Sequence, residues 1–164
     1  MAEIKKVGTF AACVIVSVIL SASAGGVGWM EGVNGSDTLH EYGLFRLCYT
    51  NAVTTGNVNK YCGEYNRVSS RWRAAQALML LAVFLSIVAC FLALVHLLKD
   101  KINSKLISLF LVMTCISALL VLAIITDLKE EEFAGRSYSW AYGLSWAGAF
   151  TALFFGIFIF GQYP

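Results

Sequence analysis

The sequence predicts a membrane α+β protein, in which a left-handed bundle of four transmembrane helices carries a small extracellular antiparallel β-sheet. Three observations predict this fold class. The 164 residues are 59% hydrophobic and 13% charged, with a mean hydropathy of +0.72, as is typical of membrane proteins. The apolar residues gather in four runs that are each long enough to cross a bilayer. A polar loop between the first two runs holds two cysteines within a strand-like pattern.

The four apolar runs predict a single four-span domain over residues 1–164. A bilayer core about 30 Å thick takes about 20 residues of helix. The first run carries no charged residue and is too long for a signal-peptide core, so we expect a retained span, with a cleaved signal as the alternative. The predicted spans are 7–29, 74–98, 106–126 and 138–160, with an outer loop at 30–73, an inner turn at 99–105, an outer loop at 127–137 and a short inner tail at 161–164.

The basic residues predict how the chain is oriented in the membrane. Five of the twelve Lys and Arg residues crowd into the short N-terminal segment and the inner turn, and short segments dominate the positive-inside rule. We therefore expect a multi-pass protein of the plasma membrane with both termini in the cytoplasm. The five residues are Lys5, Lys6, Lys99, Lys101 and Lys105.

Two of the five cysteines, Cys48 and Cys62, lie in the polar outer loop. An oxidising compartment permits a disulfide there, and closing a loop of about 15 residues would stabilise the fold by about 3 kcal/mol. The remaining cysteines lie in apolar runs, where a free thiol behaves as a small hydrophobe. They are Cys13, Cys90 and Cys115.

The same loop contains a glycosylation sequon, Asn34-Gly35-Ser36. An attached glycan would agree with an extracellular loop. Because such tripeptides also occur by chance, Asn34 is a candidate for glycosylation.

Alternating residues in the outer loop predict β-strands. One strand is expected from Tyr42 to Tyr49, and a turn at 53–56 then leads to a second strand at 57–62. A disulfide would hold these strands side by side, while 29–33 and part of 128–137 would add further strands. Along the first strand, Gly43, Phe45, Leu47 and Tyr49 are expected on one face, and Tyr42, Leu44, Arg46 and Cys48 on the other.

Small residues spaced four apart predict helix packing faces, because in lipid they let two backbones approach closely. The alternative is that such rows reflect only the abundance of small residues in membrane helices. The rows are Ser17, Ser21 and Gly25 in the first span, Ala82 and Ser86 with Cys90 in the second, and Gly143, Ala147 and Thr151 in the fourth.

Enzyme classes fit the sequence poorly. Four-span enzymes that handle glutathione conjugates need polar catalytic groups inside the spans, whereas His96 and Asp127 lie near helix ends. A quinone-linked thiol oxidase needs a reactive pair such as C-x-x-C, which Cys48 and Cys62 do not form. A tetraspanin carries a Cys-Cys-Gly motif in a large second outer loop, and this chain does not. We expect no catalytic residue, metal, cofactor or nucleic-acid partner.

Several motifs together resemble one membrane protein superfamily. Trp29, the tripeptide 43–45 (GLF), Cys48 and Cys62 resemble the outer-loop signature of the claudin, peripheral myelin protein and epithelial membrane protein superfamily, which reads W, GLW, C and C. The stretch 71–81, RWRAAQALMLL, resembles that superfamily's entry into its second helix. The stretch RSYSWAYGLSWAGAFTALFFGIF resembles the fourth span of epithelial membrane proteins and of the lens fibre membrane protein. The similarity covers nearly the whole chain.

The chain also departs from the claudin pattern. Phe45 replaces the tryptophan of GLW, and the thirteen residues between Cys48 and Cys62 exceed the usual claudin spacing slightly. Gln76 stands where claudins commonly carry an arginine. The sequence stops at 161–164 without the long tail that ends in a PDZ-binding motif, so attachment to junction scaffolds by that route is not expected. The short tail and the resemblance of the fourth span favour the epithelial membrane and lens fibre branch, which also tends to carry a glutamine at the position of Gln76.

The resemblance implies a non-enzymatic protein of cell–cell contact or membrane organisation. Its partners would be membrane lipid and either another copy, on the same or a facing membrane, or a channel or receptor subunit. The alternative function is that of a channel auxiliary subunit similar to the calcium-channel gamma subunits; a paracellular pore is less expected because the loop charges are mixed in sign. Exposed tyrosines suit partner contact, unless they only cover the helix ends. The contact candidates are Tyr42, Arg46, Tyr49 and Tyr61.

Overall fold

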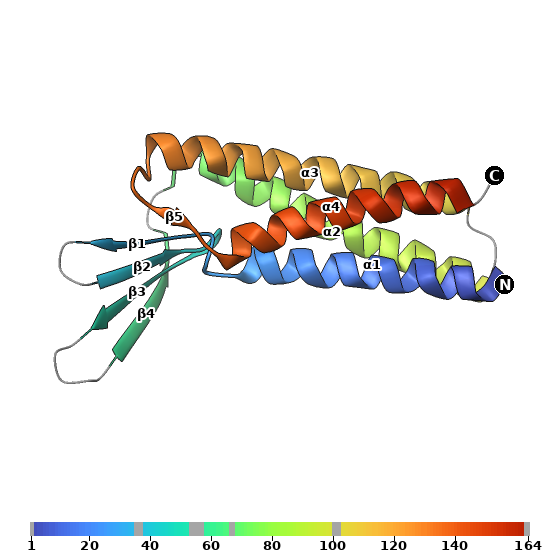
Figure 1. Ribbon diagram of the computed structural model, residues 1–164, viewed down its shortest axis with the longest axis horizontal. Helices are drawn as coiled ribbons and strands as arrows, with labels where there is room; N and C mark the ends of the chain where they lie inside the picture. The colour runs from blue at the N-terminus through green and yellow to red at the C-terminus, as the bar shows by residue number, and fades with distance from the viewer. Residues whose placement is uncertain (1, 35–37, 53–57, 66–67, 100–102, 163–164) are drawn as a thin grey trace.

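Four long helices form a bundle, and a five-stranded antiparallel sheet stands at one end of it (Figure 1). The structure is a computed structural model that describes residues 2–34, 38–52, 58–65, 68–99 and 103–162. Within these ranges, four helices are long and apolar enough to cross a membrane, as predicted. The elements are α1 (Ala2–Gly25), β1 (Met30–Asn34), β2 (Thr38–Tyr42), β3 (Arg46–Ala52), β4 (Val58–Glu64), α2 (Ser70–Lys99), α3 (Ser104–Glu131), β5 (Ser137–Tyr138) and α4 (Trp140–Gln162).

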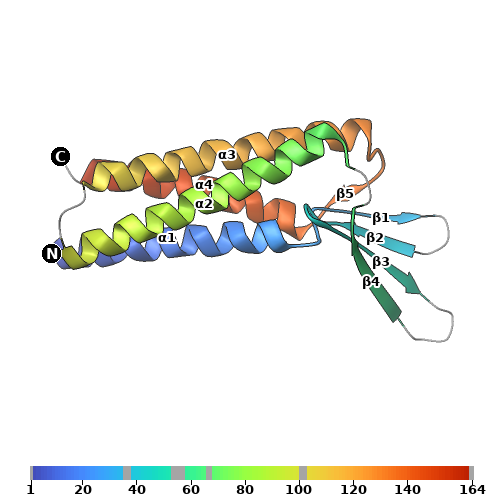
Figure 2. The ribbon, with the colours of Figure 1, turned by 180° about the vertical axis from the view of Figure 1, so that it is seen from behind.

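Each helix of the bundle packs against two others. Helices α1 and α3 both contact α2 and α4, so α2 and α4 lie diagonally across the bundle. Both views show the start of α1 and the end of α4 at the end of the bundle opposite the sheet (Figure 1, Figure 2). The even number of helices therefore brings the chain back to the side on which it began.

The first helix ends earlier than predicted. It stops at Gly25, whereas the span was expected to continue to Trp29. A Cβ atom on Gly26 would lie 2.7 Å from the Trp140 ring, and one on Gly28 would overlap that ring. Glycine favours neither helix nor strand, and here it permits a close approach to the start of α4. The chain leaves the helix in this stretch and enters β1.

The sheet has the strand order β4, β3, β2, β1, β5, and all neighbours are antiparallel. The single strand predicted from Tyr42 to Tyr49 is wrong, because β2 ends at Tyr42 and β3 begins at Arg46. The residues between them form a turn in which the N–H of Gly43 donates to the carbonyl of Arg46 at 2.8 Å. The turn places Tyr42 opposite Leu47, on the other face from Cys48.

Strand β2 was not predicted, and β5 is shorter than the predicted edge strand. Helix α3 continues to Glu131, and β5 pairs with β1 through Ser137 and Tyr138. The turn predicted at 53–56 lies outside the described residues.

Small residues do pack the helices together, but in other rows than predicted for α1 and α4. Ala82 and Ser86 of α2 are buried, whereas Ser21, Gly25, Gly143 and Ala147 are exposed and Ser17 and Thr151 are half-buried. A spacing of four does not say which face of a helix meets the bundle. In α4 the close contact is at Gly148, where a Cβ atom would lie 2.6 Å from Cδ2 of Leu20 in α1.

Candidate functional site

The turn between β2 and β3 is where the sheet meets the bundle. Leu44 is fully buried, and its carbonyl oxygen accepts two hydrogen bonds. The donors are Nε1 of Trp72 at 2.9 Å and Nε2 of Gln76 at 2.8 Å. Both donors lie near the start of α2, so this one carbonyl ties the turn to that helix. Phe45, which takes the place of the signature tryptophan, packs half-buried against the same core.

Backbone atoms lie close to Gly43, where a side chain would begin. A Cβ atom at this position would lie 2.7 Å from the carbonyl oxygen of Gly26 and 2.7 Å from Cα of Val27. The hydroxyl of Tyr65 donates to the Gly43 carbonyl at 2.7 Å. Burial raises the pKa of Tyr65 above its ordinary value, because the phenolate would lose its hydration. The hydroxyl therefore keeps its proton, and its role as a donor, well into the alkaline range.

Trp29 joins the first helix, the sheet and the fourth helix. Its side chain is fully buried, and Nε1 donates to the carbonyl of Ser23 at 2.8 Å. Its backbone N–H donates to the carbonyl of Tyr42 at 2.9 Å, and its own carbonyl accepts from the N–H of Ser139 at 3.2 Å. The N–H of Ala141 adds a bond to the Gly28 carbonyl at 2.7 Å. Trp29 is thus held from three elements at once.

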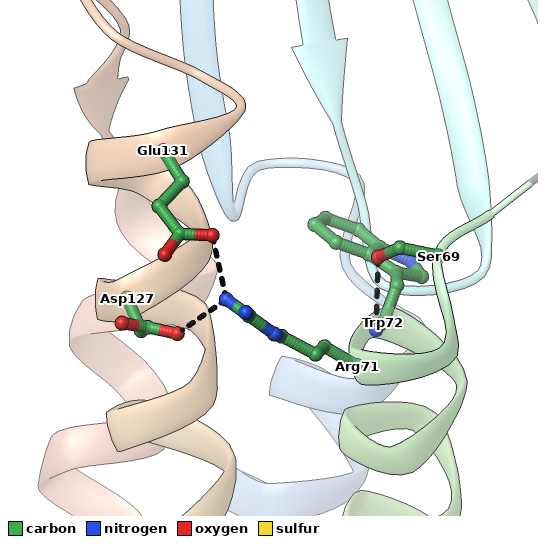
Figure 3. A network of polar contacts seen from close by, with 5 residues as sticks. All are labelled: Ser69, Arg71, Trp72, Asp127 and Glu131. Carbon is green, nitrogen blue, oxygen red and sulfur yellow. Dashed lines mark hydrogen bonds and ion pairs between the residues drawn. The ribbon is translucent and has the colours of Figure 1, made fainter.

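An ion-pair cluster joins α2 to α3 at the same end of the bundle (Figure 3). Nη1 of Arg71 lies 2.9 Å from Oδ2 of Asp127 and 2.6 Å from Oε2 of Glu131, which are one turn apart on α3. Ser69 caps α2 by accepting a hydrogen bond from the N–H of Trp72 at 3.3 Å. All three charged groups are exposed, so we expect the cluster to add little to the free energy of folding.

The predicted disulfide between Cys48 and Cys62 is confirmed. The two residues lie directly opposite each other on β3 and β4, with their Cα atoms 4.1 Å apart. The bond therefore joins the two strands that lie farthest from β5.

The membrane-length helices, the buried Trp29, the turn at 43–45 and the cysteine pair occur together in one arrangement. A family model described as the PMP-22/EMP/MP20/Claudin family matches residues 4–159. The chain belongs to this family. It is a multi-pass membrane protein, as the sequence predicted. A comparison with individual curated proteins found no match.

In this claudin-family protein the family signature builds the junction rather than an exposed surface. Trp29 and Leu44 are fully buried, and Gly43 is enclosed by backbone. The sequence could not show that Trp72 and Gln76 act on the Leu44 carbonyl, because a backbone acceptor leaves no side-chain pattern. Gln76 had signalled only a departure from the arginine that claudins commonly carry.

One face of the sheet carries exposed aromatic rings at its outer margin. Tyr49 and Tyr61 lie opposite each other on β3 and β4, with stacked rings whose centroids are 5.6 Å apart. They are 38% and 52% exposed, so both rings remain accessible. His40 continues this aromatic row on β2, with its ring 6.4 Å from that of Tyr49.

Tyr42 lies on the same face but is half-buried. Its ring meets the ring of Phe133 edge-on at 5.1 Å, and the guanidinium of Arg136 lies over it at 4.9 Å. Tyr42 therefore covers the end of α3, as the alternative interpretation of the exposed tyrosines in the sequence predicted. Of the tyrosines predicted to contact a partner, Tyr49 and Tyr61 are the accessible ones.

The opposite face of the sheet carries charges of both signs. Arg46 is exposed and lies opposite Glu64. Lys60 pairs with Glu41, and the carboxylate of Glu31 accepts a hydrogen bond from the Ser139 hydroxyl at 3.0 Å. The predicted contact residues thus divide between two faces, with Arg46 on the charged face.

The sequon and the metal prediction can be placed only within the described residues. The backbone of Asn34 ends β1 opposite Thr38, and the two residues that complete the sequon lie outside the described ranges. Among the described residues, no group of three or more His, Cys, Asp and Glu side chains could hold a metal ion.

Proposed function

We propose that this protein is a non-enzymatic contact protein of the plasma membrane. Its sheet faces the outside of the cell, its termini face the cytoplasm, and its outer strands bind a second copy on a neighbouring cell. The observation that carries the proposal is the exposed Tyr49–Tyr61 pair on two strands that a disulfide holds together at the sheet margin.

The chemistry of this pair suits recognition. Tyrosine rings give a large contact area with a polar tip, and they are enriched in protein interfaces. The Cys48–Cys62 bond limits the motion of both strands, so less conformational entropy is lost on binding. Strand β4 is an edge of the sheet, and an edge strand can also accept a strand from a partner.

The charged face supports a second candidate function, that of an auxiliary subunit of a channel or receptor. Exposed Arg46 opposite Glu64, with Lys60 and Glu41 on the same face, can meet a polar surface of a different protein in the same membrane. The same mixture of signs speaks against a paracellular pore, because ion selection requires charges of one sign along the path.

Crosslinking between two cell populations tests the proposal. Each population expresses the protein with a different tag, and a membrane-impermeant crosslinker is applied to contacting and to isolated cells. We expect crosslinks between the two tags in contacting cells, and their loss in the Tyr49→Ala/Tyr61→Ala variant. Val33→Ala, at an exposed residue on the charged face, is the matched control and should leave the crosslinks intact.

An auxiliary subunit of a channel or receptor would give a different pattern of crosslinks. Crosslinks to an unrelated channel or receptor subunit, present equally in isolated cells and retained in the tyrosine variant, would overturn the contact proposal. Loss of those crosslinks in Arg46→Ala would assign the interaction to the charged face.

A further inference from the structure

A groove lies between α3 and α4 in the half of the bundle away from the sheet. It has a volume of about 410 Å³. Its walls are mostly aliphatic and aromatic, and Leu109, Ile157 and Phe160 are each more than half exposed along it. The lining residues are Lys105, Ser108, Leu109, Val112, Ile157 and Phe160.

The two helices are in close contact at the groove, where Ser108 and Val112 of α3 meet Gly156 of α4. The hydroxyl of Ser108 is buried and donates to the carbonyl of Gly156, so it presents no free polar group to an occupant. A Cβ atom on Gly156 would lie 3.1 Å from Cγ2 of Val112. The groove is therefore an apolar channel along the seam between two packed helices, and its apolar walls suit a hydrocarbon chain.

Lys105 is the charged residue among the described residues that line this groove. Lys105 lies in the first turn of α3, and its Nζ is 5.8 Å from the centroid of the Phe160 ring. Neither Asp nor Glu occurs in residues 104–126 of α3 or anywhere in α4. Along the groove, the two helices thus supply no carboxylate to neutralise the ammonium group. Its position at a helix end allows the charge to reach the membrane surface while the stem lies along the apolar wall.

The same seam has the opposite charge at the sheet end. A second hollow there is lined by Asp127 and Glu130 together with Trp146. Arg71 pairs with Asp127 at that end, but the two carboxylates still disfavour an anionic ligand in the hollow, whereas Lys105 attracts one to the groove. Charge thus selects which end of the seam an anion can occupy.

We propose that the α3–α4 groove binds an anionic phospholipid, with one acyl chain in the apolar channel and the phosphate-containing headgroup on Lys105. A phospholipid combines the two properties that the groove requires, a hydrocarbon chain and an adjacent negative charge. With the termini in the cytoplasm, as proposed above, the groove opens in the leaflet that carries anionic lipids. The binding itself does not depend on that orientation.

Native mass spectrometry of the purified full chain tests the proposal. The protein is mixed with equal amounts of phosphatidylserine and phosphatidylcholine that carry the same acyl chains, and the first retained lipid is identified. We expect the wild type to retain phosphatidylserine preferentially, and Lys105→Gln to reduce this preference about fivefold, the effect of one basic residue near anionic lipid. Lys105→Arg should restore the preference because it keeps the charge.

Lys99→Gln is the matched control. It removes the same charge at the same end of the bundle, but from α2, which lies diagonally opposite α4. Equal losses of preference in Lys99→Gln and Lys105→Gln, or no loss in either, would overturn the proposal. Formation of the Cys48–Cys62 disulfide, read on a non-reducing gel, verifies that each variant has folded.

Two further experiments distinguish binding of a whole lipid from binding of its headgroup alone. Soluble glycerophosphoserine, which lacks acyl chains, should not displace the retained phosphatidylserine; displacement would overturn binding of the chain in the groove. Phosphatidylserine with a photoreactive acyl chain should label residues of α3 and α4 around Leu109 and Ile157. Labelling confined to α1 or α2 would overturn the assigned position.

Discussion

At the scale of single residues, the tightest constraint lies at Gly43. Three backbone atoms, from Gly26, Val27 and Arg46, lie within 2.9 Å of the position that a Cβ would occupy. A flexible side chain could move away from such a contact, but backbone cannot do so without shifting the turn or the end of α1. The signature glycine therefore sets how closely the sheet approaches the bundle.

Gly43→Ala is expected to destabilise the protein by about 1–3 kcal/mol, the usual cost of overpacking a close-packed site. Thermal unfolding of the purified protein in detergent measures the change. Gly63→Ala is the control, because a Cβ there meets no heavy atom within 4 Å. Equal stability of the two variants would contradict the importance of this close approach.

Tyr65→Phe removes the hydroxyl that donates to the Gly43 carbonyl, and it is expected to cost about 1 kcal/mol. Tyr61→Phe, at an exposed tyrosine, should cost much less. The raised pKa of Tyr65 also predicts a pH dependence. The folded state holds the phenol proton more tightly, so this contribution is complete below the ordinary phenol pKa of about 10 and is lost as the pH rises above it.

The alkaline loss is measured by comparing unfolding at neutral pH and above pH 10. The difference between wild type and Tyr65→Phe should shrink at the higher pH. A difference that grows with pH would contradict the assigned hydrogen bond.

At the scale of elements, β3 and β4 form the covalently joined part of the sheet, because the Cys48–Cys62 bond connects them at opposed positions. The remaining strands are held by backbone hydrogen bonds and by the junction at Trp29 and Leu44. Backbone pairing therefore holds every strand, and the disulfide adds a covalent link between β3 and β4.

Cys48→Ser/Cys62→Ser is expected to lower the free energy of unfolding by about 3 kcal/mol, the chain-entropy value for a loop of about 15 residues. Thermal unfolding and mobility on a non-reducing gel measure this loss. Cys90→Ala, which leaves the disulfide intact, serves as the control. Equal unfolding temperatures for the two variants would show that β3 and β4 pair firmly without the bond.

The helices could be predicted from the sequence because bilayer thickness imposes a length that only four apolar runs satisfy. The disulfide could be predicted because Cys48 and Cys62 are the cysteines of the polar loop. The division of the sheet could not, since the alternating pattern continues through Leu44 although the chain turns there.

The residues of the junction between sheet and bundle could be predicted from the sequence, but the contacts that they make could not. The signature named Trp29, Gly43 and Leu44, but their roles depend on backbone carbonyls that accept from side chains distant in sequence. The packing rows failed in α1 and α4 because small residues recur on more than one face of those helices.

At the scale of the whole molecule, the sheet and the chain ends lie at opposite ends of the bundle (Figure 2). A protein that spans a bilayer in this way exposes them to different compartments. We expect a membrane-impermeant amine reagent to modify Lys60 on intact cells, and to modify Lys105 only after the cells are permeabilised. Mass spectrometry of the labelled peptides reads the result, and the reverse pattern would contradict the proposed orientation.

The backbone bonds around Trp29 have a consequence for any contact that the sheet makes. Because Ser139 and Ala141 donate to the chain between α1 and β1, these bonds couple the orientation of the sheet to that of α1 and α4. A partner bound to the outer strands, as proposed above, would therefore also affect the tilt of the helices in the bilayer. Two cells joined through such sheets would keep a more uniform distance between their membranes than cells joined by a flexible linker, because each sheet is bonded to its own helices.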